Sequence, residues 1–81
     1  MSNSKMDEEK LKALLLETNE EFKRVYEQHQ NYERDLGELQ SKSFLSEEEK
    51  IQIVKLKKKK LKLKDKLYAV MSEYRKSHNL D

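Results

Sequence analysis

The sequence predicts an all-α fold, an antiparallel hairpin of two long helices at about residues 5–41 and 46–77. Charged residues make up 42% of the 81-residue chain, which has no proline, no cysteine and one glycine, a composition typical of long helices and coiled coils. Apolar residues recur every three or four positions in both segments. Residues 41–45 interrupt this pattern, and a helix-start signal follows them.

The first predicted helix follows a polar lead, residues 1–4, in which Asn3 or Ser4 could cap it. Its apolar residues alternate by four and three, which is the spacing of a coiled-coil seam. Gly37 costs about 1 kcal/mol relative to alanine but does not oblige the helix to end. The predicted seam positions are Leu11, Leu15, Thr18, Phe22, Val25, His29, Tyr32, Leu36 and Leu39.

The second predicted helix begins at Ser46, because Ser46 and Glu49 have the spacing of a capping box, in which each side chain binds the other residue's backbone N–H. It continues to about residue 77, and residues 78–81 are predicted to fray. A connection of four or five residues returns this helix antiparallel to the first. The seam positions that face the first helix are Ile53, Leu56, Leu63, Leu67, Val70 and Tyr74.

The second helix carries another apolar line, well over a quarter-turn from its seam. We call it the association stripe, and it consists of Ile51, Val54, Leu61 and Tyr68. One partner helix cannot cover both lines, so we expect the hairpin to self-associate into a bundle of four or more helices or to dock on a protein partner. The alternative is an extended monomer with this stripe partly exposed.

Charge is divided unevenly along the chain. Residues 50–81 hold 11 basic and 3 acidic side chains, whereas residues 1–49 hold 7 basic and 13 acidic ones. This asymmetry predicts that an acidic helix lies beside a basic one, with exposed pairs each contributing a few tenths of a kcal/mol. The expected pairs are Glu20 with Lys64 and Glu27 with Lys60.

The lysine-rich run within residues 55–66 is also consistent with a second function, the binding of nucleic acid or of an anionic membrane surface. The candidate contacts are Lys55, Lys57, Lys58, Lys59 and Lys62. Charge complementarity between helices is the preferred interpretation, because the run contains no arginine to read a base edge and no aromatic residue to stack on a base.

No combination of residues predicts an enzyme, a cofactor or a small-molecule substrate. His29 lies on the seam, and the only other histidine, His78, is near the predicted frayed end, so a polar seam residue that fixes register is preferred to a metal ligand. Loop length alone places His29 opposite Lys58, where protonation of the imidazole would be disfavoured. Asp65 has no second carboxylate or nucleophile beside it and is predicted to neutralise Lys62 or Lys66.

Compartment can also be predicted from composition. The longest wholly apolar run, residues 13–16, is far shorter than the roughly 20 residues that span a bilayer, and the first residues lack a signal-peptide pattern. The absence of cysteine permits a reducing environment. We therefore expect a cytoplasmic protein with no transmembrane segment.

Two groups of residues, within about residues 20–70, form a recognisable pattern. They are Phe22, His29, Tyr32, Leu36 and Leu39, then Leu56, Lys57, Lys58, Lys60, Leu61, Leu63, Lys64 and Asp65. This pattern resembles that of the YdcH-like family of small bacterial proteins of unknown function. Tyr32 stands where leucine is usual, and the first 19 residues lie outside the pattern. The resemblance implies a cytoplasmic helical hairpin with no assigned activity or cofactor.

Overall fold

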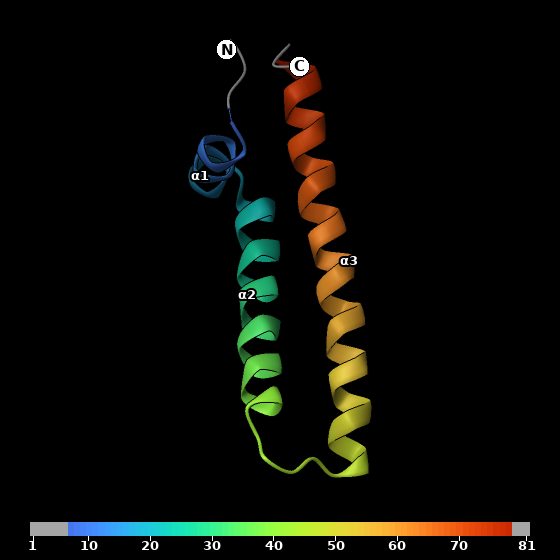
Figure 1. Cartoon of the computed structure of the whole chain (residues 1–81). Coiled ribbons are helices and arrows are strands. Elements are labelled where there is room, and N and C mark those ends of the chain that lie inside the picture. The colour runs from blue at the N-terminus through green and yellow to red at the C-terminus, as the bar shows by residue number, and fades with distance from the viewer. Residues whose placement is uncertain (1–6, 79–81) are drawn as a thin grey trace.

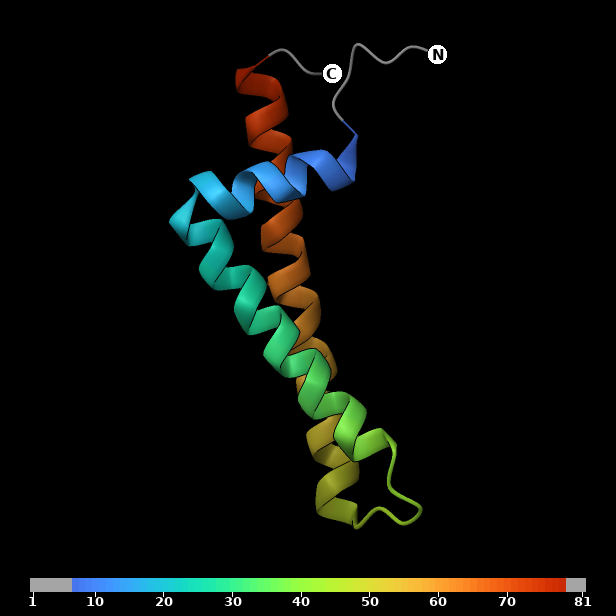
Figure 2. The same cartoon turned by 90° about the vertical axis from the view of Figure 1, so that its left-hand side faces the viewer.

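The computed structural model describes residues 7–78 and contains three helices in that range (Figure 1). Helix α1 spans Glu8–Thr18, α2 spans Glu20–Gln40 and α3 spans Glu47–Ser77. Helices α2 and α3 form an antiparallel pair, and α1 crosses this pair at the end opposite the loop (Figure 2). The all-α class is confirmed, whereas the prediction of only two helices is wrong.

Asn19 divides the first predicted helix in two. Its backbone is extended, with φ −126° and ψ 108°, and its side chain accepts a hydrogen bond of 2.9 Å from the Phe22 N–H, which makes it the N-cap of α2. The Asn19 N–H donates to the Leu15 carbonyl and closes α1. Thr18, which was predicted to lie on the seam, is exposed and donates its hydroxyl to the Leu14 carbonyl.

The break is favourable because it buries the apolar face of α1. Glu21 pairs with Lys66, so a straight helix would have placed Leu11 near the last turn of α3, beside Arg75 and Lys76. Because α1 instead folds across the α2–α3 pair, Leu11 is fully buried. Burying a leucine side chain contributes about 1.5–3 kcal/mol. The resulting core consists of Leu11, Leu15, Phe22, Val25, Leu67 and Met71.

Local capping sets the ends of the helices. Helix α1 begins at Glu8 instead of near residue 5, because Asp7 is extended and its carboxylate accepts a hydrogen bond of 2.9 Å from the Lys10 N–H. The predicted caps Asn3 and Ser4 lie outside the described residues, as does the rest of the predicted polar lead. The capping box that starts α3 is confirmed, because the side chain at each end of the box accepts from the opposite backbone N–H, at 3.1 and 2.9 Å.

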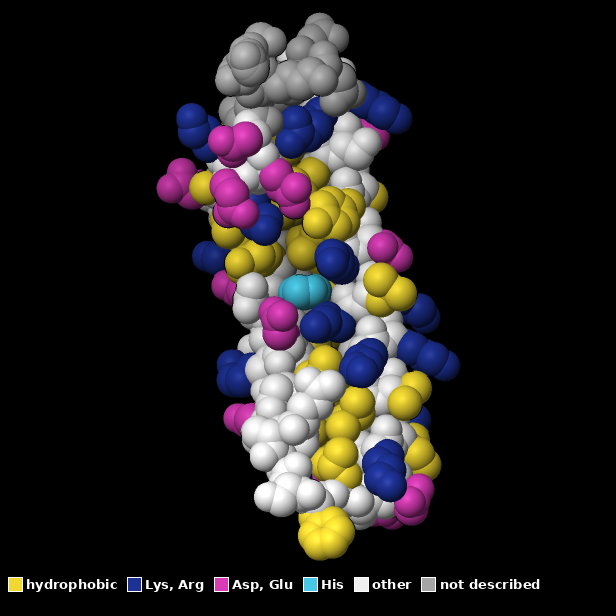
Figure 3. All heavy atoms as spheres, in the orientation of Figure 1, with side chains coloured by type: hydrophobic (Ala, Val, Ile, Leu, Met, Phe, Trp, Pro, Cys, Tyr) yellow, Lys and Arg dark blue, Asp and Glu magenta, His cyan; other side chains and the backbone are white. Residues whose placement is uncertain are grey.

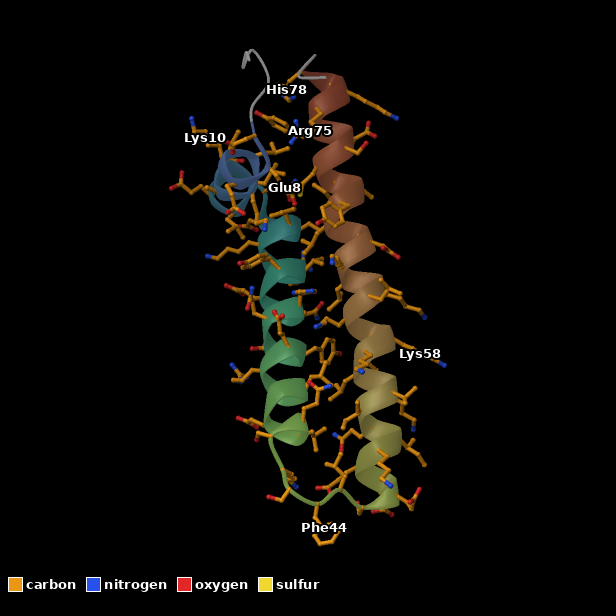
Figure 4. All side chains as sticks on the ribbon, in the orientation of Figure 1. Glu8, Lys10, Phe44, Lys58, Arg75 and His78 are labelled. Atoms are coloured by element: carbon orange, nitrogen blue, oxygen red, sulfur yellow. The ribbon has the colours of Figure 1, made fainter. Side chains whose placement is uncertain are left out.

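The opposite ends of the hairpin differ in their packing. Near the loop, only Leu36 and Leu56 are buried, and both lie outside the core where the three helices meet. The Phe44 side chain, in the loop, is 88% exposed (Figure 4). Lys42 donates a hydrogen bond to Glu49, which lowers the pKa of that carboxyl and ties the loop to the first turn of α3. At the other end His78 caps α3 and stacks on Tyr74, while residues 79–81 of the predicted tail lie outside the described residues.

Candidate docking surface and cavity

From Phe22 onward the predicted seam lies between α2 and α3. Its first three positions, Leu11, Leu15 and Thr18, lie on α1, which crosses the end of this pair (Figure 2). The half-buried members include His29, Tyr32, Leu39, Ile53 and Leu63. The buried members are Leu11, Leu15, Phe22, Val25, Leu36, Leu56 and Leu67. Met71 is a core residue that was not predicted to lie on the seam, although its position four residues after Leu67 was an available signal.

The association stripe lies on the exposed side of α3. The side chains of Ile51, Val54, Leu61 and Tyr68 are between 47% and 58% exposed. Together with Phe44, they are the exposed large hydrophobic residues of the described chain. The structure therefore presents a line of half-exposed apolar side chains that none of its own described helices covers.

Lysines border the middle of this stripe on both sides. At 100° per residue, Lys57 and Lys64 lie on one side of the line through Leu61, and Lys58 and Lys62 lie on the other. All four are exposed, and Lys58 projects away from α2 (Figure 4). The stripe is thus an apolar line between two rows of positive charge.

The five lysines proposed as anion contacts are all exposed, but one of them also serves the fold. The Lys59 ammonium lies 5.7 Å from the centre of the Tyr32 ring on α2, within the range of a cation–π interaction. Lys55, Lys57, Lys58 and Lys62 remain on the outer surface of α3.

The acidic and basic helices do pair, but not through the predicted residues. The observed ion pairs between α2 and α3 are Glu33 with Lys60 at 3.8 Å and Glu21 with Lys66 at 3.4 Å. The predicted pairs of Glu20 with Lys64 and Glu27 with Lys60 are wrong, because Glu20 and Glu27 line a shallow depression formed by α2 alone. Loop length did not fix which turns of the two helices face each other.

His29 is half-buried between α2 and α3, but it does not lie opposite Lys58 as predicted. Burial is the main cause that lowers the pKa of His29 below its usual value of 6.5. Lys60 and Lys64 on α3 and Lys12 on α1 act in the same direction, whereas Glu33, one turn further along α2, raises it. The neutral imidazole is therefore favoured in the folded state.

The family assignment follows from a comparison with known families. Residues 22–71, more than half of the chain, match the family described as protein of unknown function, DUF465. The chain belongs to this family. DUF465 is the YdcH-like family of small helical proteins, so the resemblance noted in the sequence is confirmed. No curated protein and no solved structure shows a significant match to the chain.

The DUF465 match covers most of the α2–α3 hairpin but not α1. The crossing of α1 over the hairpin is therefore a feature outside the family pattern. Among residues 7–78 of this DUF465 protein, no three His, Cys, Asp or Glu side chains are grouped to hold a metal ion. Within the same range, no helix has the length and apolarity needed to cross a membrane.

His29 is expected to make the folding stability of this protein sensitive to acid. Since the folded-state pKa of His29 is lowered, the unfolded chain binds the proton more readily, so stability is fully present above about pH 6.5 and declines as the pH falls towards the folded-state value. The urea midpoint of the native protein should therefore fall more between pH 8 and pH 5 than that of His29→Leu. The other titrating groups are common to both proteins. Parallel pH profiles would contradict the proposed effect of the lysines and burial on His29.

Proposed function

We propose that this chain is a non-enzymatic helical interaction module that docks an acidic amphipathic helix of another protein on the association stripe. The observation that carries the proposal is the exposure of Ile51, Val54, Leu61 and Tyr68 in one line along α3. Exposed contiguous apolar surface bordered by polar residues is typical of protein interaction sites.

The shape of the stripe favours a helix as its occupant. Its residues are separated by three, seven and seven positions, which is the spacing by which one helix meets another in a coiled coil. A partner helix with apolar residues at matching intervals would cover all four side chains at once. Lys58 and Asp65, four residues after Val54 and Leu61, lie on one edge of the line and would fix the register of the partner.

Charge complementarity favours an acidic partner over a second copy of the chain. Two α3 helices packed stripe to stripe would bring Lys57, Lys58, Lys62 and Lys64 against the same lysines of the other copy, and facing like charges disfavour pairing. Helix α2 is acidic but has no exposed large hydrophobic residue to cover the stripe. An acidic amphipathic helix satisfies both requirements, because glutamates flanking its apolar line would meet the two lysine rows.

A probe peptide can test this proposal. An acidic peptide of three heptads, with leucine at the two seam positions and glutamate at the flanking ones, should bind, whereas a peptide with lysine at the flanking positions should not. Leu61→Gln should weaken binding of the acidic peptide by about tenfold or more, because it removes an apolar contact from the centre of the interface. Phe44→Gln, which changes an exposed apolar residue away from the stripe, should leave the affinity unchanged in calorimetry.

Three results would contradict the proposal. These are equal affinity for the acidic and basic peptides, equal losses of affinity in Leu61→Gln and Phe44→Gln, and a stable homo-oligomer in sedimentation equilibrium at tens of micromolar.

The second candidate function is binding of nucleic acid through the exposed lysines of α3. It would be supported if affinity for a DNA duplex fell by about one unit of log K per phosphate contact for each tenfold rise in salt.

A further inference from the structure

A cavity of about 270 Å³ opens where α1, α2 and α3 meet. Its apolar wall includes the core residues Phe22, Leu67 and Met71, with Tyr26 and Tyr68 beside them. Figure 3 shows this face of the molecule, where a histidine with lysine or arginine side chains beside it lies in the groove between α2 and α3, below a group of hydrophobic atoms. The cavity is distinct from the association stripe, with which it shares only Tyr68.

Positive charges reach the rim of the cavity from two different helices. Lys12 comes from α1 and Lys60 and Lys64 come from α3, and all three act electrostatically on His29. Glu33 also lines the cavity, but it pairs with Lys60. Neither Lys12 nor Lys64 forms an ion pair with a described residue.

The remaining acidic residue of the rim, Glu8, lies towards the end of α3. It also lines a neighbouring cavity with Arg75, and Figure 4 shows both side chains in that region between α1 and α3. The charged residues of the lining are therefore three lysines, Lys12, Lys60 and Lys64, and two glutamates, Glu8 and Glu33, a net charge of +1. This net positive charge lies next to an apolar wall.

We propose that this cavity binds a small anion with an apolar or aromatic body. Its charged group would lie between Lys12 and Lys64, with the His29 imidazole as a further hydrogen-bond partner. Its body would lie against Tyr26 and Tyr68, the aromatic residues of the lining that are not buried, next to the core residues Leu67 and Met71. Ligand sites of this kind combine a largely apolar lining with a few polar groups that fix orientation.

The size and exposure of the cavity define the ligand class further. At the roughly 30 Å³ that a water-sized group occupies, the cavity holds roughly ten non-hydrogen atoms, the size of a phosphorylated or carboxylated ring. Lys64 is exposed and Lys12 is half-buried, so a bare anion would gain little from leaving water for this rim. The apolar body supplies the remaining affinity by covering the exposed parts of the Tyr26 and Tyr68 rings.

Phenyl phosphate is a suitable probe for an NMR titration of the full chain. We expect saturable shifts of the Tyr26, His29 and Met71 resonances with a Kd on the order of 1 mM, as small ligands of this size commonly show. Inorganic phosphate and phenol should each bind at least about tenfold more weakly, because each lacks one half of the recognised chemistry. Saturation with phenyl phosphate should also raise the pKa of His29, since a bound anion offsets Lys12, Lys60 and Lys64 and adds to the effect of Glu33.

Matched variants locate the site. Lys12→Gln and Lys64→Gln should each weaken phenyl phosphate binding by about five- to tenfold, because each removes a charged hydrogen-bond donor from the rim. Lys10→Gln on α1 and Lys58→Gln on α3 change the net charge equally, but both residues lie outside the cavity lining and should bind as the native protein does (Figure 4). Thermal melting of each variant verifies that it is folded.

The proposal is overturned if inorganic phosphate binds as tightly as phenyl phosphate, or if the control variants lose as much affinity as the rim variants. The two proposals share Lys64 and Tyr68, but they can be tested separately, because Leu61→Gln removes a residue of the stripe that does not line the cavity. That variant should retain phenyl phosphate binding even where it loses the acidic peptide. Loss of both in Leu61→Gln would also count against a separate site.

Discussion

Phe22→Ala is expected to lower the free energy of unfolding by about 3–5 kcal/mol, the largest effect of any single substitution proposed for this chain. The Phe22 side chain is fully buried and belongs to the core formed by all three helices. Its removal leaves a cavity that three helices would have to close together. Urea unfolding followed by circular dichroism at 222 nm measures the loss, which is a large part of the 5–15 kcal/mol that stabilises a typical domain.

Phe44→Ala is the matched control, because it makes the same chemical change at a side chain that is 88% exposed. Surface substitutions of this kind usually change stability by no more than about 0.5 kcal/mol. Similar losses in the two variants would show that Phe22 is not the centre of the core described here.

Leu11→Ala is expected to cost about 2–5 kcal/mol, because Leu11 is also fully buried and has its contacts across the α1 crossing. The loss cannot exceed the free energy with which α1 docks on the hairpin, since beyond that point α1 detaches and α2 and α3 remain paired. Amide hydrogen exchange distinguishes the two cases. Detachment would abolish protection in Glu8–Thr18 while protection in the paired helices persists.

Leu14→Ala provides the control for this substitution on the same helix. Leu14 is only half-buried and is not part of the core. We expect less than half of the loss measured for Leu11→Ala. Equal losses would indicate that α1 packs on the hairpin through a different face.

Helix α3 could be predicted almost to the residue, because the signals that define it are local. Ser46 and Glu49 form a capping box within four residues, and no glycine or proline interrupts the 31 residues that follow Ser46. The association stripe could also be predicted, since the residues that share one face of a helix follow from helix geometry alone. Whether another molecule covers that face is not a property of one chain's sequence.

The break at Asn19 could not be predicted from periodicity, because the spacing of apolar residues continues through Thr18 as if the helix were straight. The break depends on a tertiary gain, the burial of Leu11 and Leu15 across the end of the hairpin. A local signal was present nonetheless. Asn19 followed by two glutamates is a good helix start, with acidic residues in the first turn.

The register between α2 and α3 and the residues that line the cavity were not predicted correctly, for the same reason. The cavity needs Lys12, and Lys12 reaches the rim only because α1 folds back. Which residues of α3 lie opposite His29 depends on the conformation of the six loop residues, and the length of the loop alone does not determine it. Interactions between elements therefore required the structure, whereas interactions within an element did not.

The uneven distribution of the core along the hairpin has a consequence for how a partner would bind. The end of α3 that carries Tyr68 is held by α1 and the three-helix core, whereas the end that carries Ile51 and Val54 is held mainly by Leu36 and Leu56. Local opening thus requires less free energy near the loop than near α1. A partner that binds first at Tyr68 meets a preformed surface, and one that binds first at Ile51 must also suppress the fluctuations of the turns beneath it.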